Sequence, residues 1–325
     1  MKRFLIIQTA YLGDVILATS LIETLKLRYP DAEIDIVVNP LASSLLENHQ
    51  SIDRVIVFDK SRGKLKAFKK TSREVKTKQY DEVINLHRFF SSGLLSFLAK
   101  GNKKIGFKKN PFSMLYHKKV DHEIGDGTHE VERNLKLIEH HGITEALRPT
   151  LYPSLAHYEK VESFKNKKYF CLAPASVWKT KQLPNEKWIN LLKELAKKGN
   201  CFMLGAPNDA DLANQLIHEA KIDAVNLCGQ LNLLESAALM HDATMNFVND
   251  SAPLHIASAM NAPVKAFFCS TVSSFGFGPL SENAEIIETK EQLACRPCGI
   301  HGYKACPKGH FKCGHTIEMG EALKF

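Results

Sequence analysis

The stretch from Asn246 to Ala262 reads N-F-V-N-D-S-A-P-L-H-I-A-S-A-M-N-A and decides the fold of the second half of the chain. It predicts a buried strand end, a polar turn with capping residues Asn249, Asp250 and Ser251, and then a helix. A strand leading into a capped helix aims backbone N–H groups and a partial positive charge beyond the sheet edge, which suits an anion. The stretch indicates either a site for the phosphates of a nucleotide-linked substrate or an ordinary capped connection, and by itself it does not separate the two.

Strands and helices alternate on both sides of this stretch. Short apolar runs bounded by turn residues predict strands, and apolar residues at a period of 3.6 predict helices between them. The predicted strands are Phe4–Ile7, Ile34–Val38, Arg54–Phe58, Glu82–Leu86, Tyr169–Ala173, Cys201–Leu204, Ala243–Val248 and Val264–Phe268; helices are expected over 15–29, Leu41–Asn48, 60–78, Ser91–Ala99, Thr128–His141, Asn185–Lys198, Asp209–Ala220 and Leu233–His241. Such alternation is typical of an α/β protein with parallel, doubly wound sheets.

The alternation is interrupted near Pro149–Pro153 and then restarts. With 325 residues, the chain suits two domains of about 150 residues each. We expect them to span 1–155 and 156–325 and to enclose a cleft between the carboxyl ends of their sheets, where doubly wound proteins bind ligands.

Composition narrows the class of protein. The apolar and charged fractions, 44% and 24%, are those of a soluble protein. The sequence shows no apolar run long enough to span a bilayer and no secretory signal pattern. We therefore expect a cytoplasmic protein whose eight cysteines are mostly reduced.

The net charge of +8 is concentrated in two blocks. Lys60–Lys78 holds nine Lys/Arg and one acid, and Lys100–Lys119 holds seven Lys and no acid. These blocks indicate an anionic partner, either nucleic acid, a phosphorylated glycolipid or an anionic membrane, or else simply a solvated basic face. Few aromatic residues interleave with the first block, and zinc-finger and RNA-recognition signatures are missing, which argues against nucleic acid.

The first strand-to-helix turn contains Gly13 and Asp14. Gly13 would permit an unusual backbone angle and the close approach of a ligand. Asp14 could cap the following helix, or it could act as a base that takes a proton from a substrate hydroxyl. Neither the dinucleotide-binding G-x-G-x-x-G pattern nor the P-loop pattern is present.

A second candidate loop, A-P-A-S-V-W-K-T-K-Q-L-P-N-E-K-W over 173–188, follows a predicted strand. Its Ser176, Lys179, Thr180 and Lys181 suit a diphosphate, although a basic surface loop has the same composition. Asp209 or Asp211, after a neighbouring strand, could bind a ribose hydroxyl, as acidic residues do in related sheets.

Cys295, Cys298, Cys306 and Cys313 form a C-x2-C-x7-C-x6-C pattern with three histidines interspersed. The spacing permits a structural zinc site but departs from common zinc ribbons, so free or redox-labile thiols are the alternative. The other four cysteines lie in or beside predicted strands and are expected in the core.

Taken together, the motifs resemble the bacterial ADP-heptose:lipopolysaccharide heptosyltransferase family, glycosyltransferase family 9, over nearly the whole chain. The matching pieces, in order, are Gly13–Val15, T-H-E-V-E-R-N over 128–134, G-Q-L-N-L-L-E-S-A over 229–237, N-D-S-A-P-L-H over 249–255, and the cysteine cluster. Two departures stand out: Ala252 occupies a position where the family usually has Gly, and Asn261 one where a second Gly is common.

The resemblance implies a GT-B fold, two Rossmann-like domains facing across a cleft, and inverting transfer that requires no cofactor or catalytic metal. The N-terminal domain would bind a phosphorylated glycolipid acceptor at the inner face of the cytoplasmic membrane, and the C-terminal domain would bind ADP-heptose. Asp14 matches the family's catalytic base and Lys181 its diphosphate-binding lysine. The implied donor contacts are Ser176, Lys181, Asp209, Asp250, Ser251, Ala252 and His255, and the acceptor contacts are Gly13, Lys66, Lys69 and Lys70.

Three other readings stay open at this point. The chain could be a GT-B glycosyltransferase that uses another nucleotide sugar. It could also be a non-catalytic basic protein that binds nucleic acid, as its isoelectric point near 8.9 allows. Finally, the cysteine cluster could serve a metal-sensing or redox-sensing role.

Overall fold

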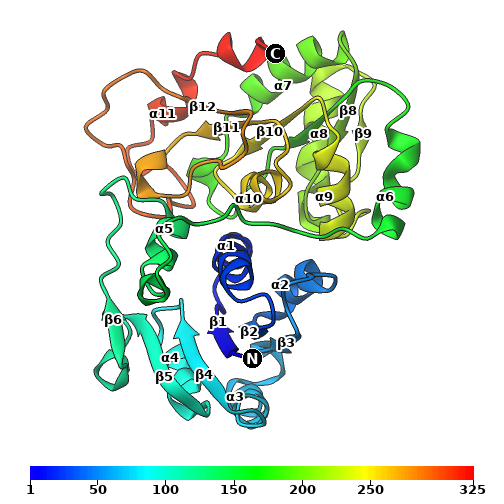
Figure 1. Cartoon of the computed structure of the whole chain (residues 1–325). Helices are drawn as coiled ribbons and strands as arrows, with labels where there is room; N and C mark the ends of the chain where they lie inside the picture. Colours follow the sequence, from blue (N-terminus) through cyan, green and yellow to red (C-terminus); the bar gives the residue numbers. More distant parts are fainter. The chain divides into compact units, whose positions relative to one another are not determined.

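The computed structural model describes residues 1–325 except the side chain of Arg62, and the chain divides into two compact units, Met1–Tyr152 and Pro153–Phe325 (Figure 1). The sequence pattern placed the boundary a few residues later. Each unit carries its own parallel sheet.

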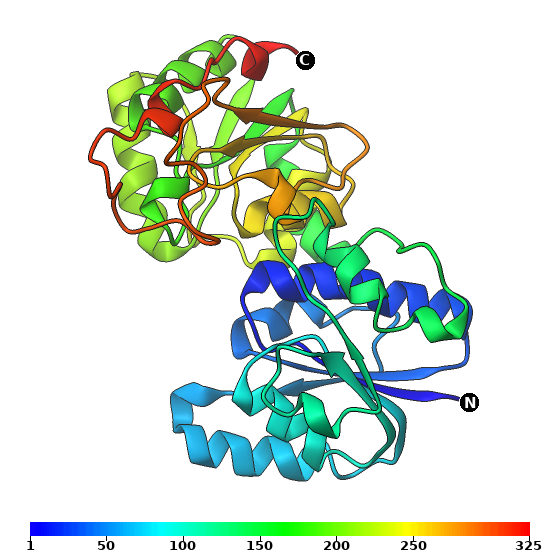
Figure 2. The same cartoon turned by 90° about the vertical axis from the view of Figure 1, so that its left-hand side faces the viewer.

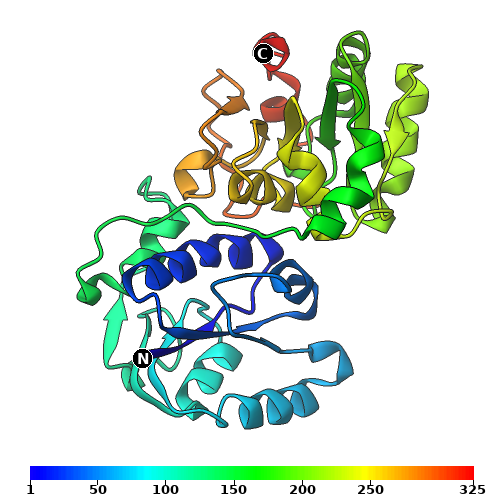
Figure 3. The same ribbon diagram turned by 45° about the vertical axis from the view of Figure 1, so that its right-hand side comes forward.

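The sheet of the first unit has six strands in the order β3-β2-β1-β4-β5-β6, counted over the described residues. Its elements are β1 (Arg3–Ile7), α1 (Leu12–Arg28), β2 (Glu33–Val38), α2 (Pro40–Ser43), η1 (Ser44–Leu46), β3 (Arg54–Val57), η2 (Lys60–Arg62), α3 (Lys64–Glu74), β4 (Tyr80–Asn85), α4 (Phe90–Leu98), β5 (Gly101–Phe107), η3 (Ser113–Leu115), β6 (Lys118–Val120), α5 (Glu130–Leu135) and η4 (Glu139–His141). Helix α1 packs against α2 and α5 on one face, and α3 packs against α4 on the other (Figure 3).

Strand β1 lies at the centre of this sheet because both of its faces are apolar. Phe4, Leu5, Ile6 and Ile7 are fully buried, as expected for a strand that helices cover on both sides. Ile6 pairs in parallel register with Ile36 of β2 and with Ile84 of β4.

The second unit has six strands in the order β12-β11-β10-β7-β8-β9 within the described residues. Its elements are α6 (Leu155–Val161), η5 (Glu162–Phe164), β7 (Tyr169–Ala173), η6 (Lys179–Lys181), α7 (Asn185–Ala196), β8 (Asn200–Met203), η7 (Pro207–Asp209), α8 (Ala210–Ala220), β9 (Val225–Asn226), α9 (Leu233–His241), β10 (Met245–Asn249), α10 (Ala252–Ala259), β11 (Val264–Phe268), η8 (Ser273–Phe275), β12 (Ala284–Glu288), α11 (Lys312–His315) and η9 (Glu321–Leu323). Helices α7 and α8 pack together, and α9 packs against α6 and α10 (Figure 2).

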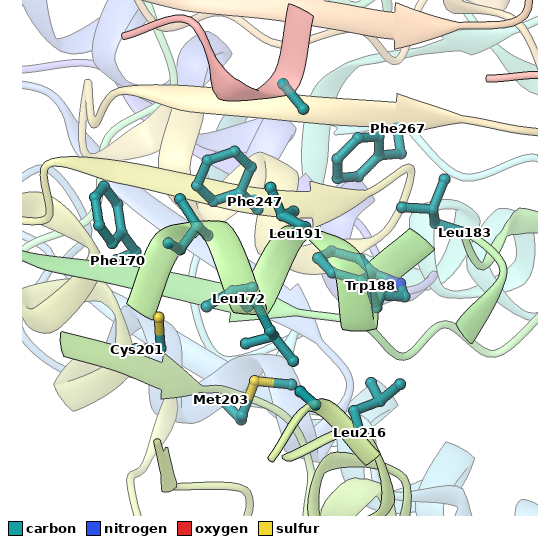
Figure 4. Close-up of a cluster of buried hydrophobic side chains, with 14 of the residues drawn as sticks. Phe170, Leu172, Leu183, Trp188, Leu191, Cys201, Met203, Leu216, Phe247 and Phe267 are labelled. Carbon is teal, nitrogen blue, oxygen red and sulfur yellow. The ribbon is translucent and has the colours of Figure 1, made fainter. Parts of the chain in front are cut away.

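The core of the second unit lies between its sheet and helix α7. Trp188 of α7 meets Phe267 of β11 edge to face, with ring centroids 5.2 Å apart, and Phe170 and Phe247 come from neighbouring strands (Figure 4). Cys201 packs in the same cluster, and Cys171, Cys228 and Cys269 are also buried, so these four cysteines are core thiols as predicted.

Both sheets reverse their winding once, between β1 and β4 in the first unit and between β7 and β10 in the second. At such a switch point the following helices leave toward opposite faces, and the crevice between them is the usual ligand site. The two predicted candidate turns, after β1 and after β10, lie at these positions.

The structure differs from the sequence prediction in two segments of the first unit. The basic segment Lys100–Lys119, which received no assignment, contains β5, which lies between β4 and β6, and the edge strand β6. The helix predicted over Thr128–His141 ends at Leu135, and a separate 3-10 turn follows. In the described chain, no helix combines the length and apolar character needed to cross a bilayer.

Candidate active site

Lys181 and Asp250 form an ion pair in the second unit. Lys181 Nζ lies 2.7 Å from Asp250 Oδ2, and the side chains are only 14% and 7% exposed. Thr271 Oγ1, beyond the end of β11, donates to the same carboxylate oxygen at 2.6 Å. The candidate loop after β7 and the turn after β10 therefore meet at the switch point, and together they form a charged, partly desolvated site.

Asn249 fixes the distance between these two segments. Its buried side chain accepts a hydrogen bond from the backbone N–H of Leu183 at 2.9 Å and donates to the carbonyl of Pro174 at 2.7 Å. Both ends of the loop that carries Lys181 are thus bound to the last residue of β10. Such bonds leave few alternative loop positions, which is what a preorganised site requires.

The start of helix α10 differs from the expected side-chain cap. Ser251 is the N-cap residue, but its hydroxyl makes no capping bond and instead points back to the carbonyl of Asn249 at 3.4 Å. Asn249 and Asp250 direct their side chains to the bonds described above. The capping prediction for these three side chains is therefore wrong. Distant partners hold Asn249 and Asp250, and the Ser251 hydroxyl turns to the carbonyl of Asn249, two residues earlier.

The two departures from the family pattern have different structural consequences. Ala252 is the first residue of α10 and lies in helical backbone, where glycine is not required. Asn261, just beyond the helix, has a φ of 51°, a left-handed conformation that glycine adopts freely and that asparagine tolerates better than most residues. His255 is buried one turn into the helix, with its ring 6.5 Å from that of Phe277.

The cysteine-rich tail braces the Lys181 loop. The backbone of Tyr303 exchanges hydrogen bonds with Thr180: its N–H donates to Thr180 Oγ1 at 2.8 Å, and its carbonyl accepts from the Thr180 N–H at 3.0 Å. Arg296 donates to the carbonyls of Cys269 and Thr271, each at 2.8 Å. The sequence analysis missed Arg296, because nothing in its local pattern indicates a partner that is distant along the chain.

Asp14 lies in the first unit at the third position of α1, directly beyond the central strand β1. Desolvation, followed by the negative charge of Glu130, raises the pKa of its carboxyl to about 7, while Arg88 and backbone hydrogen bonds lower it. A carboxyl group with this pKa is half ionised near neutral pH, which suits a general base. Gly13 lies in the first turn of the same helix, so the predicted unusual backbone angle at Gly13 is wrong.

A buried polar network adjoins Asp14 from helix α5, which packs against α1. Glu130 accepts from His122 Nε2 at 3.1 Å and from Arg133 Nε at 2.8 Å. Arg88 Nη1 lies 3.4 Å from His122 Nδ1. Because arginine can only donate, His122 Nδ1 must accept, and its ring proton therefore faces Glu130. Hydrogen bonds from His122 and the charge of Arg133 outweigh burial and hold the pKa of Glu130 below its usual range.

The sequence analysis did not identify this network as part of the site. It noted 128–134 only as a stretch resembling the family, and His122 and Arg88 lie in segments without a motif. A buried Arg133, 1% exposed, would have been the clue, but burial cannot be read from a short helix with mixed composition.

The neighbouring His87 hydrogen-bonds Thr9 Oγ1 through Nδ1 at 2.9 Å, and desolvation, followed by the charges of Lys60 and Arg88, lowers its pKa to about 4.

The remaining predicted residues occupy varied positions. Ser176 is half-buried in the Lys181 loop, where its carbonyl accepts from Gln182 at 2.8 Å. Asp209 accepts from the N–H of Ala206 at 2.8 Å and closes its own turn after β8. Lys66, Lys69 and Lys70 are exposed on α3.

A cavity of about 330 Å³ opens at the carboxyl ends of β1, β2 and β3 in the first unit. It is lined by Thr9, Asn39, Pro40, Phe58, Asp59, Lys60 and Ser61. Hydroxyl, amide and charged groups around such a space suit a polar ligand.

The structure does not support the structural zinc site that the cysteine spacing permits. Cys295 Sγ lies 3.9 Å from His310 Nε2, and Cys298 Sγ points to the carbonyl of Cys295 at 3.0 Å. In the described residues, the four cysteines are not among the groups whose ligand atoms gather within 4.8 Å of one another.

The group that does gather is Glu82, His140 and His141. Each histidine Nε2 lies 3.0 Å from a Glu82 oxygen, but Lys118 Nζ lies 3.5 Å from His140 Nδ1 and Lys103 Nζ 3.9 Å from Glu82. A lysine can only donate, so the His140 proton is on Nε2, facing Glu82. The cluster is therefore satisfied by hydrogen bonds and is poorly suited to a cation.

The chain is similar to known proteins over most of its length. The family model for glycosyltransferase family 9 (heptosyltransferase) matches residues 68–301. Lipopolysaccharide heptosyltransferase 2 of Escherichia coli (strain K12) is 26% identical over 312 residues, covering 88% of this chain and 87% of the relative.

Two solved structures share the fold. The glycosyl transferase family 9 protein from Veillonella parvula DSM 2008 superposes with a TM-score of 0.80 at 21% identity, covering 88% of this chain and 85% of the other. The E. coli ADP-heptose LPS heptosyltransferase II superposes with a TM-score of 0.75 at 21% identity, covering 96% and 97%. At these identities the superpositions show the fold alone.

Proposed function

The chain belongs to glycosyltransferase family 9, the heptosyltransferases, and from that premise we propose that it transfers a heptose from ADP-heptose to a sugar of the lipopolysaccharide inner core. Glycosyl transfer to lipopolysaccharide agrees with the names of its relatives. The single observation that carries the proposed mechanism is the position of Asp14, which follows β1 at the switch point of the first unit, where burial and the charge of Glu130 raise the pKa of its carboxyl.

The donor would bind in the second unit. Lys181, Ser176 and the start of α10, with Asp250, Ser251, Ala252 and His255, supply a cation, hydroxyls and backbone N–H groups for a diphosphate. Thr271 holds Asp250, so this carboxylate keeps a partner when Lys181 turns toward the phosphates. Asp209 stays a prediction for the ribose, with one oxygen already engaged in its turn.

The acceptor would bind in the first unit. The cavity beside Thr9 and Lys60 can take a polar sugar, and the exposed Lys66, Lys69 and Lys70 supply charge for acceptor phosphates. Replacing these three lysines by glutamine is expected to weaken acceptor binding and to leave donor binding unchanged. A loss of donor affinity would contradict the roles given to the two units.

The proposed reaction gives each of these groups a role. The Asp14 carboxylate takes the proton of an acceptor hydroxyl as that oxygen attacks the anomeric carbon, and the bond from this carbon to the ADP oxygen breaks. ADP leaves from the opposite face, which inverts the anomeric centre. Lys181 and the α10 N-terminus stabilise the charge growing on the diphosphate, an effect of about 10²–10³ in rate for each donor lost.

A donor screen tests this proposal. Purified protein is incubated with a delipidated inner-core acceptor and ADP-heptose, UDP-sugars or GDP-sugars, and release of the nucleoside diphosphate is measured. We expect turnover with ADP-heptose alone. Turnover with a UDP- or GDP-sugar would instead support another glycosyltransferase of the same fold, which the low identity to the relatives leaves open.

A further inference from the structure

Helix α4 and the 3-10 turn η3 expose a group of large apolar side chains in the first unit. Phe89 and Phe90, at the start of α4, are 66% and 61% exposed, and Phe97, near its end, is 43% exposed. Met114 and Leu115, in η3, are 87% and 48% exposed. We call these five residues, with the half-buried Phe112 between them, the α4–η3 surface.

The surface is continuous. The ring of Phe112 lies 5.1 Å from that of Phe90 and 6.4 Å from that of Phe97, so it joins the two ends of α4. The N–H of Leu115 donates to the carbonyl of Phe112 at 2.9 Å, which places η3 directly beside these rings. Isolated exposed apolar residues are common, but a contiguous aromatic group is typical of an interaction site.

The surface is also rigid. Buried Asn110 donates to the carbonyls of His87 and Phe89 at 2.9 and 3.2 Å and accepts from the N–H of Phe112 at 2.9 Å, which ties the loop before η3 to the start of α4. Gly93 permits this contact, since a Cβ there would lie 2.2 Å from Asn110 Oδ1 and 2.8 Å from Phe112. These hydrogen bonds and the close contact at Gly93 thus fix the backbone that carries the exposed rings.

Lysines border the same surface. Lys104 is half-buried, and its Nζ donates to the carbonyl of Phe97 and lies 4.9 Å from the centre of that ring, whereas Lys109 is exposed in the loop before η3. The segment Lys100–Lys119 contains seven lysines and no acid. Helix α3, which packs against α4, adds further exposed lysines. Apolar side chains bordered by lysines complement an anionic lipid surface, in which rings insert at the headgroup level and ammonium groups meet phosphates.

We infer that the α4–η3 surface docks the protein onto an anionic phospholipid bilayer. Its position serves the reaction, a point that rests on the proposed function: Phe89 follows β4 by a few residues and its ring lies 4.6 Å from that of His87, beside the carboxyl edge that carries Asp14. A lipid-anchored acceptor in the same bilayer would present its sugars at this edge without leaving the membrane.

Cosedimentation with vesicles tests the inference on the full chain. Vesicles of phosphatidylglycerol and phosphatidylcholine are compared with phosphatidylcholine alone. We expect the wild-type protein to bind the anionic vesicles and to dissociate as salt is raised. Phe90→Ser/Met114→Ser/Leu115→Ser should lower the partition coefficient by about tenfold or more, since binding scales with buried apolar area. Lys109→Gln should lower it by about fivefold.

The matched control is Leu155→Ser/Val225→Ser, which removes two exposed apolar side chains, 74% and 43% exposed, from the second unit. It should bind vesicles like the wild type. All variants should keep the heat-unfolding shift caused by ADP and their turnover with a delipidated acceptor, so that a loss of vesicle binding is separated from misfolding and from failure of the proposed reaction.

Three results would overturn the inference. The first is equal binding of the wild-type protein to neutral and anionic vesicles, and the second is equal binding by the wild-type protein and the triple variant. The third is a dimer in size-exclusion chromatography that the triple substitution converts to a monomer, because the surface would then be covered by a second copy of the chain.

Discussion

Lys181 Nζ lies 2.7 Å from Asp250 Oδ2, and this ion pair joins the loop after β7 to the turn after β10. Two motifs that are far apart in the sequence therefore form one site. Because both side chains are largely buried, the pair holds the lysine charge in a low-dielectric setting, where it would act on the proposed diphosphate more strongly than in water.

Lys181→Ala is expected to lower donor affinity by about 10- to 100-fold, the range for losing a charge-assisted hydrogen bond, and to slow transfer as well. Calorimetric titration with ADP and steady-state kinetics measure the two effects. Lys179→Ala is the matched control, because Lys179 is exposed in the same 3-10 turn and lacks the bond to Asp250. Equal losses in the two variants would mean that loop charge, rather than this lysine, matters.

Asp14→Ala is expected to abolish transfer while ADP affinity is retained, since Asp14 lies in the other unit. In the wild-type enzyme kcat/KM should rise with pH through a midpoint near 7, because the carboxylate is the active base and desolvation places its pKa there. Near-normal turnover of Asp14→Ala would remove Asp14 from the mechanism.

Glu130→Gln is expected to move that midpoint to lower pH by about 0.5–1 unit, since a nearby negative charge raises the pKa of Asp14 and the amide removes that charge. The pH profile of kcat/KM measures the shift. Glu132→Gln, on the exposed face of the same helix, should leave the midpoint unchanged. A structural role for Glu130 alone would lower the melting temperature without moving the profile.

Asp14→Asn is expected to raise the free energy of unfolding at pH 8 by about 1–2 kcal/mol. Each unit of pKa shift is worth about 1.36 kcal/mol, and only part of the full sum is expected because solvent screens the charge. Between about pH 4 and 7 the native state holds the Asp14 proton that the unfolded chain has lost, so stability falls as pH rises through this window. Asparagine cannot ionise, and denaturant titrations should show the gain vanishing below about pH 4. A gain that persists there would have another origin.

Gly302→Ala is expected to loosen the brace between the tail and the Lys181 loop. A Cβ at Gly302 would lie 2.8 Å from Thr180 Oγ1 and 2.9 Å from Ser270 Oγ. Gly309→Ala is the control, because its φ of 72° resembles the 76° of Gly302 while its added Cβ would meet no atom within 4 Å. Backbone strain should lower the free energy of unfolding of both variants by about 1 kcal/mol. ADP affinity, however, should fall in Gly302→Ala alone. Equal ADP affinities of the two variants would show that the tail does not contribute to the donor site.

Much of the fold could be read from local pattern. The strands Tyr169–Ala173 and Val264–Phe268 were predicted with the bounds that the structure has, because short apolar runs between turns leave little choice of period. Strand β5 and the edge strand β6 were not, since their lysines replace the apolar signal. Capping at Ser251 was predicted wrongly because its hydroxyl bonds the carbonyl of Asn249 instead of a helix N–H group.

The sequence by itself determined the α/β class and the family, and it singled out Asp14, Lys181 and Asp250, because periodicity and motif order are local properties of the chain. The tertiary structure alone decided that Lys181 pairs with Asp250, that Glu130 and its partners His122 and Arg133 set the charge around Asp14, and that α4 and η3 share one apolar surface. These relationships depend on burial and on contacts between distant segments, and a pKa or a surface exists only after packing has removed water from some groups and left it on others.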